Sequence, residues 1–396
     1  MERRHFLKQS ALASSLFFVP SFVRAFENVS NTSLGFKKLV IIQMAGGNDG
    51  LNTIIPYSND IYYYSRPTLA IKKDALITIN EHLGFHQSLG PLKNLYDKGY
   101  VSIINNVGYP NPNRSHFRST DIWQTASDAD EYLDTGWLGR YLDENLHKSY
   151  GGIELDDSLS LVLKGKTLNG IATKNPAILY NNMQTPYFKK VLDHQSEEHL
   201  SEHNLGYLYQ TMIEARSSAK YIYETSKTFK SSFEYPDNPF GKQLKTTAEF
   251  INSGLKSRVY YISMGGFDTH AGQINRQSRL LDIYSKSIDV FVKDLERNNT
   301  FKDTLILTFS EFGRRLKQNA ANGTDHGAAN NVFLIGKNLK APGFYNEMPN
   351  LSNLDNNGDV KHTVDFRSIY ATILDRWLEV NDAAILNRSF SKLIFN

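Results

Sequence analysis

Side chains that bind metal ions or transfer protons gather in five short segments of the sequence, most of them beside glycines. Aspartate, glutamate and histidine are ligands that suit Zn²⁺, Mn²⁺, Mg²⁺ or Ca²⁺. A serine beside such a metal can be deprotonated and act as a nucleophile. The pattern therefore predicts a metal-assisted reaction at a shared site. In chain order, the segments supply Asp49; Arg114, Ser115 and His116; Asp268 and His270; Glu311 and Arg314; and Asp325 and His326.

Each segment taken alone also has an ordinary structural explanation. An Asp-x-His sequence such as Asp268–His270 is commonly a turn with an exposed histidine, and Asp49 in GGNDG can cap a turn. Ser115 suits the N-cap of a helix. A carboxylate directly after an apolar strand, such as Glu311, needs a partner when it is buried. The recurrence of such residues after several strands favours a common site over separate structural roles.

The segments follow apolar runs that are typical of buried strands. Helical patterns alternate with these strands, which predicts an α/β fold with a mostly parallel central sheet and helices on both faces. In such sheets ligands bind beyond the carboxyl ends of the strands, where the segments lie. The expected strands are 37–44, 100–107, 258–264, 304–309 and 332–335, and the expected helices are 87–98, 115–126, a long helix after His270, and 366–377.

The amino-acid composition of the 396 residues excludes several classes of protein and of functional site. With 40% hydrophobic residues the chain can bury a large core, so the bulk is not disordered. The absence of cysteine excludes a disulfide scaffold, a thiolate zinc site and a cysteine nucleophile. No basic run interleaved with aromatic residues occurs, so we expect no nucleic-acid partner. Residues 186–255 are rich in Lys, Glu, Ser and His, and we expect a helical insertion there, within the same domain.

The N-terminus has the organisation of an export signal. Arg3 and Arg4 precede Phe6-Leu7-Lys8, a mildly apolar stretch covers 11–23, and Ala25 offers a small residue for cleavage. The apolar stretch is shorter than the ~20 residues of a membrane-spanning helix. We therefore expect a twin-arginine-type signal at 1–25, a domain over 26–396, and a mature chain in the periplasm or cell envelope without a transmembrane segment.

The formal net charge of +3 belongs to this signal. Residues 1–25 hold four basic residues and one acidic residue, so their removal leaves a mature chain of zero net charge. The overall charge therefore does not indicate an acidic partner.

Several longer motifs carry a resemblance to a known family. The signal, LVIIQMAGGNDGLNTIIPY, GYPNPNRSHFRSTDIWQTA, YYISMGGFDTHAGQ, LILTFSEFGRR, NGTDHG and VDFRSIYATIL occur in this order. They resemble a large family of exported bacterial proteins of unknown function, usually placed in the alkaline phosphatase and sulfatase superfamily. The resemblance covers nearly all of the mature chain and implies an alkaline phosphatase-like fold.

The superfamily resemblance implies a two-metal hydrolase of phosphate or sulfate esters. It matches Asp49 to a metal-binding aspartate and Ser115 to the nucleophile. It matches Asp268, His270 and His326 to the ligands of one metal and Glu311 to a ligand of the other. Phe312 stands where the superfamily has a histidine ligand, so the second site lacks a nitrogen. Two alternatives follow: Asp325 replaces the missing ligand, or the chain binds only one metal. Arg114 and Arg314 are expected to hold the anionic ester by forked hydrogen bonds.

Two other functions remain open from the sequence. The first is a non-catalytic envelope protein on a degenerate phosphatase fold, binding a glycan or a partner chain, which the loss of the histidine at Phe312 motivates. The second is a metal-independent serine esterase, because GGND resembles an oxyanion-hole block and Asp157-Ser158-Leu159 resembles a nucleophile block. In this chain the two blocks stand in the reverse of the usual order. The metal identity and the substrate are left open.

Overall fold

The computed structural model describes residues 36–186, 188, 190 and 203–394. The expected signal at 1–25 lies outside the described residues, and so does part of the expected insertion. Residues Lys37–Asn396 form one compact unit by their contacts. None of the described helices is both long and apolar enough to cross a membrane.

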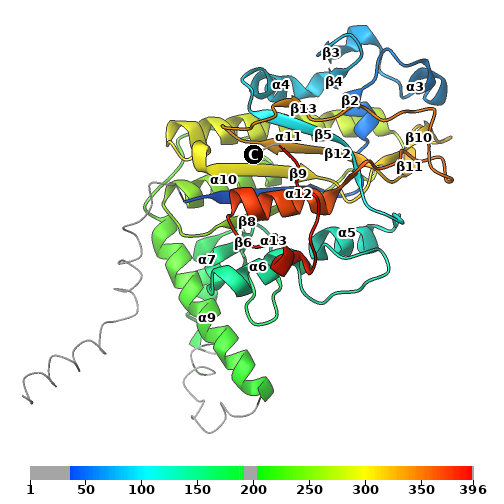
Figure 1. Cartoon of the computed structure of the whole chain (residues 1–396). Coiled ribbons are helices and arrows are strands. Elements are labelled where there is room, and N and C mark those ends of the chain that lie inside the picture. Colours follow the sequence, from blue (N-terminus) through cyan, green and yellow to red (C-terminus); the bar gives the residue numbers. More distant parts are fainter. Residues whose placement is uncertain (1–35, 187, 189, 191–202, 395–396) are drawn as a thin grey trace, which may run out of the picture. The chain divides into compact units, whose positions relative to one another are not determined.

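A nine-stranded sheet runs through the described residues (Figure 1). Its strands follow the order β13-β5-β12-β9-β1-β8-β6-β7, with β14 also paired to β5. All neighbouring pairs are parallel except those of β12, which runs antiparallel to both β5 and β9. The predicted mostly parallel sheet is confirmed. The strands are β1 (Lys38–Met44), β5 (Val101–Gly108), β6 (Gly152–Glu154), β7 (Ile171–Ala172), β8 (Val259–Met264), β9 (Thr304–Phe309), β12 (Asn330–Ile335), β13 (Gly343–Phe344) and β14 (Val364–Asp365).

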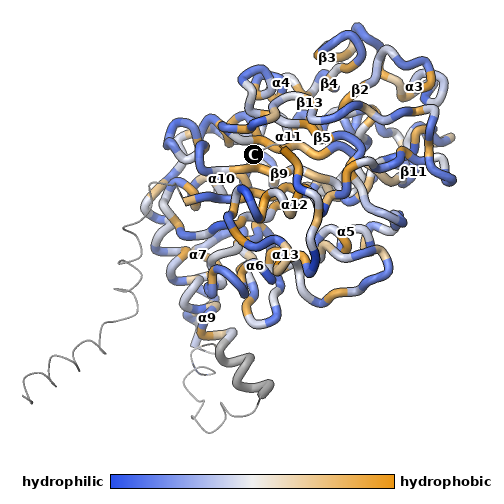
Figure 2. Tube along the Cα trace, in the orientation of Figure 1, coloured by the Kyte–Doolittle hydropathy of each residue, from blue (hydrophilic) through white to orange (hydrophobic). Residues whose placement is uncertain are grey.

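The two faces of the sheet bury separate hydrophobic cores, because successive side chains of a strand point to opposite faces. In β1, Val40 and Ile42 enter one core and Leu39 and Ile41 enter the other. Figure 2 shows the resulting hydrophobic strands inside a hydrophilic periphery. Both faces are covered, which explains why the strands read as continuous apolar runs in the sequence.

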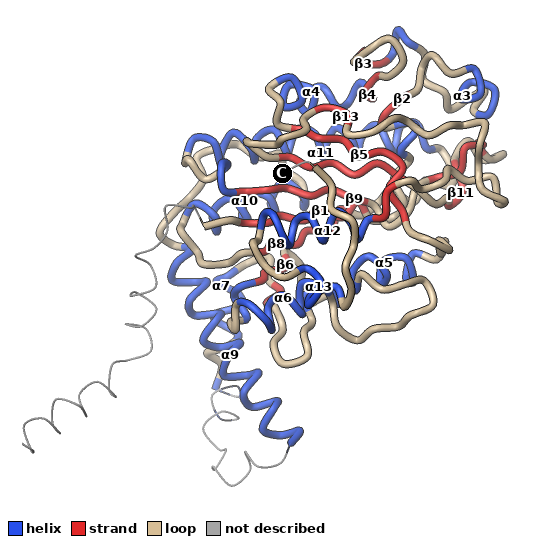
Figure 3. The backbone as a smooth tube through the Cα atoms, in the orientation of Figure 1, coloured by secondary structure: helices blue, strands red, loops and turns tan. Residues whose placement is uncertain are grey.

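Helices cover both faces, as predicted (Figure 3). The first core contains buried residues of α4 (Gly90–Asp97), α9 (His203–Ser226), α10 (Pro239–Asn252) and α11 (Gln273–Arg297). The second core contains residues of α5 (His116–Thr125), α6 (Trp137–Asn145), α12 (Phe366–Thr372), the π-helical turn Ile373–Trp377 and α13 (Asp382–Leu386). Leu281, Ile288 and Leu295, expected on one face of the long helix, all enter the first core.

Smaller elements complete the fold at the carboxyl edge of the parallel strands. They are the antiparallel pair β10 (Arg314–Gln318) and β11 (Thr324–His326), the sheet β2-β4-β3 (Ile54–Ile55, Gly84–His86 and Leu76–Thr78) and α3 (Asp60–Ser65). The short helix α7 (Pro176–Asn182) packs against α9 instead. The reversed direction of β12 matters for the site. Because β12 is antiparallel, its start lies at the edge where the parallel strands end, and β11, which precedes it, reaches the same place.

Candidate metal centre

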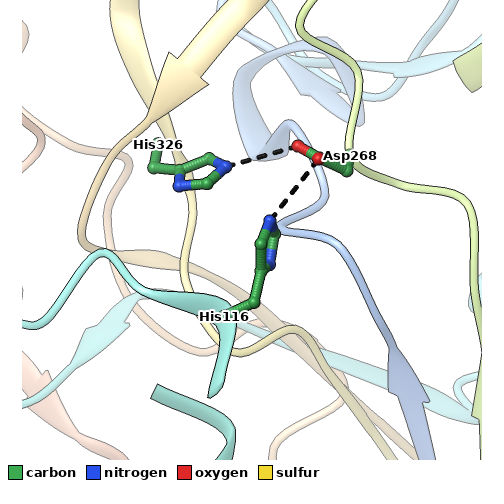
Figure 4. A group of neighbouring side chains, drawn as sticks. All are labelled: His116, Asp268 and His326. Carbon is green, nitrogen blue, oxygen red and sulfur yellow. Dashed lines mark hydrogen bonds and ion pairs between the residues drawn. The ribbon is translucent and has the colours of Figure 1, made fainter. Parts of the chain in front are cut away.

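Three side chains from separate elements meet at the carboxyl edge of the sheet (Figure 4). His116 begins α5, Asp268 follows β8, and His326 ends β11. The Nε2 atom of His326 lies 3.3 Å from Oδ1 of Asp268. The Nε2 atom of His116 lies 3.6 Å from Oδ2 of the same carboxylate. One donor atom of each residue falls within 4.8 Å of the other two, which is the spacing of ligands around one metal ion.

His270 joins this group from the loop after β8. Its Nε2 atom lies 2.8 Å from Nε2 of His326 and 3.1 Å from Oδ1 of Asp268. We refer to His116, Asp268, His270 and His326 as the metal centre. Close backbone approaches at two glycines bring these residues together. A Cβ on Gly46, whose φ is +120°, would lie 2.3 Å from the amide nitrogen of Asp268, and a Cβ on Gly323 would lie 2.3 Å from the carbonyl carbon of His270.

The second nitrogen of each imidazole faces an oxygen acceptor. Nδ1 of His116 lies 2.9 Å from Oε1 of Glu311, and Nδ1 of His326 lies 2.8 Å from the carbonyl oxygen of Arg114. Nδ1 of His270 lies 3.2 Å from Oδ1 of Asp325. These partners assign the proton of a neutral imidazole to Nδ1, which leaves the lone pair on Nε2. Metal-binding histidines are oriented by outer oxygen acceptors of this kind.

The inward-facing nitrogens are poorly satisfied by the protein alone. Nε2 of His116 is buried and has no hydrogen-bond partner among the described residues. Nε2 of His270 and Nε2 of His326 approach to 2.8 Å, and two lone pairs at this distance repel unless a proton or a cation lies between them. A set of imidazoles and one carboxylate is the donor chemistry of a divalent metal such as Zn²⁺. The residues present therefore fit a metal ion.

The carboxylate of Asp268 is kept ionised. Partial burial raises its pKa, but the hydrogen bond from Arg314 and the contacts with the neighbouring histidines outweigh the burial and lower the pKa to about 2. The hydrogen bond with Glu311 raises the pKa of His116, against the effect of burial. Burial lowers the pKa of His326. At neutral pH the centre thus offers an anionic carboxylate and, at His326, a neutral imidazole, which are the forms that bind metals.

Phe312 forms an apolar wall of the centre. Its ring centroid lies 4.9 Å from that of His116 and 4.6 Å from that of His326. At this sequence position the superfamily resemblance implies a histidine, and here the imidazole of His116, which comes from α5, packs against the ring of Phe312. His116 was not among the predicted ligands. Its position next to Ser115 at a helix start was the one sequence signal that could have identified it.

A cleft of about 460 Å³ opens onto the centre. Glu311 is almost fully buried at its floor, whereas the ring of Phe117 is 87% exposed. A group from solvent can therefore reach His116 and Asp268 through this cleft. The lining residues are Ala45, Gly46, His116, Phe117, Thr120, Asp121, Asp268 and Glu311.

The predicted catalytic residues have different surroundings. Ser115 is exposed at the N-cap of α5, and its hydroxyl makes no capping hydrogen bond within the described part of the chain. Arg114 is half-buried and forms an ion pair with the buried Asp359. Arg314 is fully buried and donates to Oδ1 of Asp268 at 2.7 Å. Its guanidinium also donates to the carbonyl oxygens of Gly46, Gly47, Phe267 and Thr324, so it holds the loops of the site together.

Asp49 lies in a separate buried network. One of its carboxylate oxygens forms an ion pair with Arg66 at 2.6 Å and accepts from the side-chain amide of Gln273. The other accepts from the backbone N–H groups that start the 3₁₀ turn Gly50–Asn52. Gln277 donates to the backbone carbonyl of Asp49. We refer to Asp49, Arg66, Gln273 and Gln277 as the Asp49 network; each of its side chains is at least 98% buried.

Solved structures to which the chain is similar include an alkaline phosphatase superfamily protein from Vibrio parahaemolyticus (11% identity, covering 89% of this chain and 69% of that one, TM-score 0.42). The PsFucS1 sulfatase from Pseudoalteromonas sp. matches at 11% identity over 94% of this chain and 73% of its own, with a TM-score of 0.41. The C-terminal periplasmic domain of EcEptC from Escherichia coli matches at 11% identity over 91% and 89%, with a TM-score of 0.41.

No curated protein matches the chain. A sequence family does match, over residues 100–388, and its description is "Protein of unknown function (DUF1501)". The matched region contains α5, β8, β9 and β11, and thus every residue of the metal centre. The resemblance to a family of unknown function, inferred from the motifs, is confirmed: the chain belongs to the DUF1501 family.

Proposed function

We propose that this chain is a metal-dependent hydrolase of phosphate or sulfate esters, exported to the periplasm or cell envelope by the signal at 1–25. The observation that carries the proposal is the convergence of three imidazole Nε2 atoms on the carboxylate of Asp268, with Nε2 of His116 buried and without a hydrogen bond among the described residues. A group of side chains that served only to stabilise the fold would give that nitrogen a hydrogen bond. A buried polar group without a hydrogen bond lowers the stability of the fold by about 1–3 kcal/mol.

His116, Asp268 and His326 would hold the metal, with His270 beside them. Three protein ligands and an open position are typical of a catalytic site. A divalent cation bound there supplies a Lewis acid that stabilises negative charge on the transferring group. The sequence suggests Glu311 and Asp325 as ligands. In this proposal they instead orient the imidazoles by contacting Nδ1 of His116 and Nδ1 of His270, respectively. Both carboxylate oxygens of Asp49 already accept from protein donors, so we do not place Asp49 in this ligand set.

Ser115 is the nucleophile in this proposal. Ser115 is exposed, and its sequence neighbours are Arg114, whose carbonyl oxygen faces Nδ1 of His326, and the proposed ligand His116. The serine oxygen attacks phosphorus or sulfur, the bond to the alcohol oxygen breaks, and the serine proton leaves with the alcohol. Water then cleaves the seryl ester, releasing the acid and restoring the hydroxyl. The positive end of α5 favours the anionic substrate.

Arg114 is the better candidate of the two predicted arginines for holding the ester oxyanion. About a third of its side chain is exposed although it pairs with Asp359. Arg314 is fully enclosed by backbone carbonyls and Asp268, and we assign it to positioning Asp268. A guanidinium binds phosphate or sulfate by paired N–H donors, which a lysine cannot reproduce.

The test is hydrolysis by the purified full chain after its bound metals have been measured. We expect turnover of an aryl phosphate, phosphodiester or aryl sulfate that disappears with a chelator, returns with metal, and is lost in Ser115→Ala. Ser58→Ala, which alters an exposed serine elsewhere, should retain it. Turnover that ignores both the chelator and the Ser115 substitution would exclude the proposal.

Phe312 favours a second candidate, a non-catalytic envelope protein that binds a glycan or an anionic ester. Its ring packs against two imidazoles where the superfamily resemblance implies a further ligand. A protein that binds metal and retains an anionic glycan without hydrolysing any of the three ester classes would support this candidate. Turnover dependent on Ser115 would remove it.

A further inference from the structure

Two threonines lie within the segments that supply three of the four residues of the metal centre. Thr269 stands between Asp268 and His270, and Thr324 stands two residues before His326. Both threonine side chains are buried, although Asp268, next to Thr269, lines the cleft. The backbone N–H of Thr324 donates to the carbonyl oxygen of Thr269 at 3.3 Å, so the two segments run side by side.

Both threonine hydroxyls donate to a single atom, Oε1 of Gln273. The distances are 3.2 Å from Thr269 and 2.6 Å from Thr324. Gln273 begins α11 and is 0% exposed. One side chain therefore ties together two segments that are more than fifty residues apart in the sequence.

The orientation of the Gln273 amide is fixed from its other end. Its Nε2 donates to Oδ2 of Asp49 and, at 3.2 Å, to Oε1 of Gln277. Rotating the amide would bring its oxygen against the carboxylate of Asp49, which repels it. Asp49 is itself held by Arg66, whose guanidinium also donates to the carbonyl oxygens of Arg315 and Leu316 in β10.

We propose that Gln273 is a positioning residue of the metal centre and that Asp49 acts through it, as the anchor of Gln273 and not as a metal ligand. The proposal rests on the proposed function for its metal. The two threonine hydrogen bonds to Gln273, which we call the clamp, fix the distance between the ligands on the loop after β8 and the ligand on β11. Removing an outer partner of this kind typically weakens metal binding by 10- to 100-fold.

The first test is Zn²⁺ titration of the full chain after metal removal. Thr324→Val keeps the side-chain shape and removes the hydroxyl, and we expect it to weaken Zn²⁺ binding by about tenfold. Thr324→Ser keeps the hydroxyl and should retain an affinity within about threefold of the wild type. The matched control is Thr304→Val, which removes a buried hydroxyl that donates to the carbonyl oxygen of Thr300 at the opposite end of β9.

The second test needs no metal. Amide hydrogen exchange of the metal-free chain should quicken in 267–271 and 322–327 for Thr324→Val and for Gln273→Met, and stay unchanged there for Thr304→Val. A wild type that binds no Zn²⁺ would contradict the proposed function, while the exchange experiment still decides on the clamp. Unchanged exchange in both segments, or a Zn²⁺ affinity of Thr324→Val equal to that of the control, would overturn the inference.

Discussion

The metal centre and the Asp49 network both collect charged side chains that follow strands of the same sheet, and they differ in how those charges are satisfied. In the Asp49 network each carboxylate oxygen has protein donors, and a guanidinium supplies the opposite charge. In the metal centre Nε2 of His116 is buried and makes no hydrogen bond with the described part of the chain, and two other imidazole nitrogens face each other. The comparison teaches that a carboxylate at the end of a strand is not by itself evidence for a ligand site. It indicates one only when some hydrogen-bonding atoms of the carboxylate, or of the side chains next to it, have no hydrogen bond from the protein.

The largest expected effect comes from breaking the ion pair of the Asp49 network. Arg66→Met leaves the buried carboxylate of Asp49 without its cation, and we expect the free energy of unfolding to fall by about 3–5 kcal/mol. Urea denaturation of the metal-free chain measures this change. Lys93→Met, which breaks the exposed pair with Asp97, should cost no more than about 1 kcal/mol. Equal losses for the two variants would show that Asp49 does not depend on Arg66.

Glu154 offers a contrast to Asp49, because it is a buried carboxylate at the end of β6 with no ion pair in the described ranges. It accepts from the N–H and the hydroxyl of Ser160, and burial raises its pKa from 4.5 to about 7. Between these values the folded chain holds a proton that the unfolded chain has released. Stability from this group is therefore complete below pH 4.5 and is lost as the pH rises to about 7.

We expect Glu154→Gln to remove this loss. Relative to the variant, the wild type should become less stable by up to about 3 kcal/mol as the pH rises through this window, since one pKa unit corresponds to about 1.4 kcal/mol. Denaturation curves at several pH values measure the slope. Glu144→Gln, at an exposed position, serves as the control and should follow the wild type. A difference between wild type and Glu154→Gln that is independent of pH would contradict the assignment.

Substituting a residue of the metal centre should change the Zn²⁺ affinity more than it changes the free energy of unfolding. We expect His116→Ala to weaken Zn²⁺ binding by about a hundredfold or more, because it removes a proposed ligand nitrogen that makes no hydrogen bond within the described ranges. Unfolding of the metal-free variant should change by less than it does in Arg66→Met. His82→Ala, at an exposed position, should bind Zn²⁺ as the wild type does. Retained affinity in His116→Ala would place the ligands elsewhere.

The sequence predicted the sheet, its helices and the edge where the candidate residues gather, because buried strands read as apolar runs and glycines follow them. Asp268, His270 and His326 do lie together in the structure. The partner of Asp49 could not be predicted, since Arg66 and Gln273 reach it only through tertiary packing. The role of His116 was also out of reach, because its distance from Phe312 and His326 depends on how α5 docks against β11.

The smallest expected change in Zn²⁺ affinity comes from Glu311, and it tests whether this residue is a ligand or only orients one. Glu311→Gln keeps an acceptor for Nδ1 of His116 and for the N–H of Gly46, but it removes the charge that makes the imidazole more basic. We expect about tenfold weaker Zn²⁺ binding. Because the hydrogen bond with Glu311 raises the pKa of His116, the NMR titration midpoint of this imidazole in the metal-free variant should move down. Asp282→Asn, which alters an exposed pair with Lys286, should change neither quantity. A loss as large as that of His116→Ala, with an unchanged midpoint, would make Glu311 a ligand and extend the metal centre beyond its four residues.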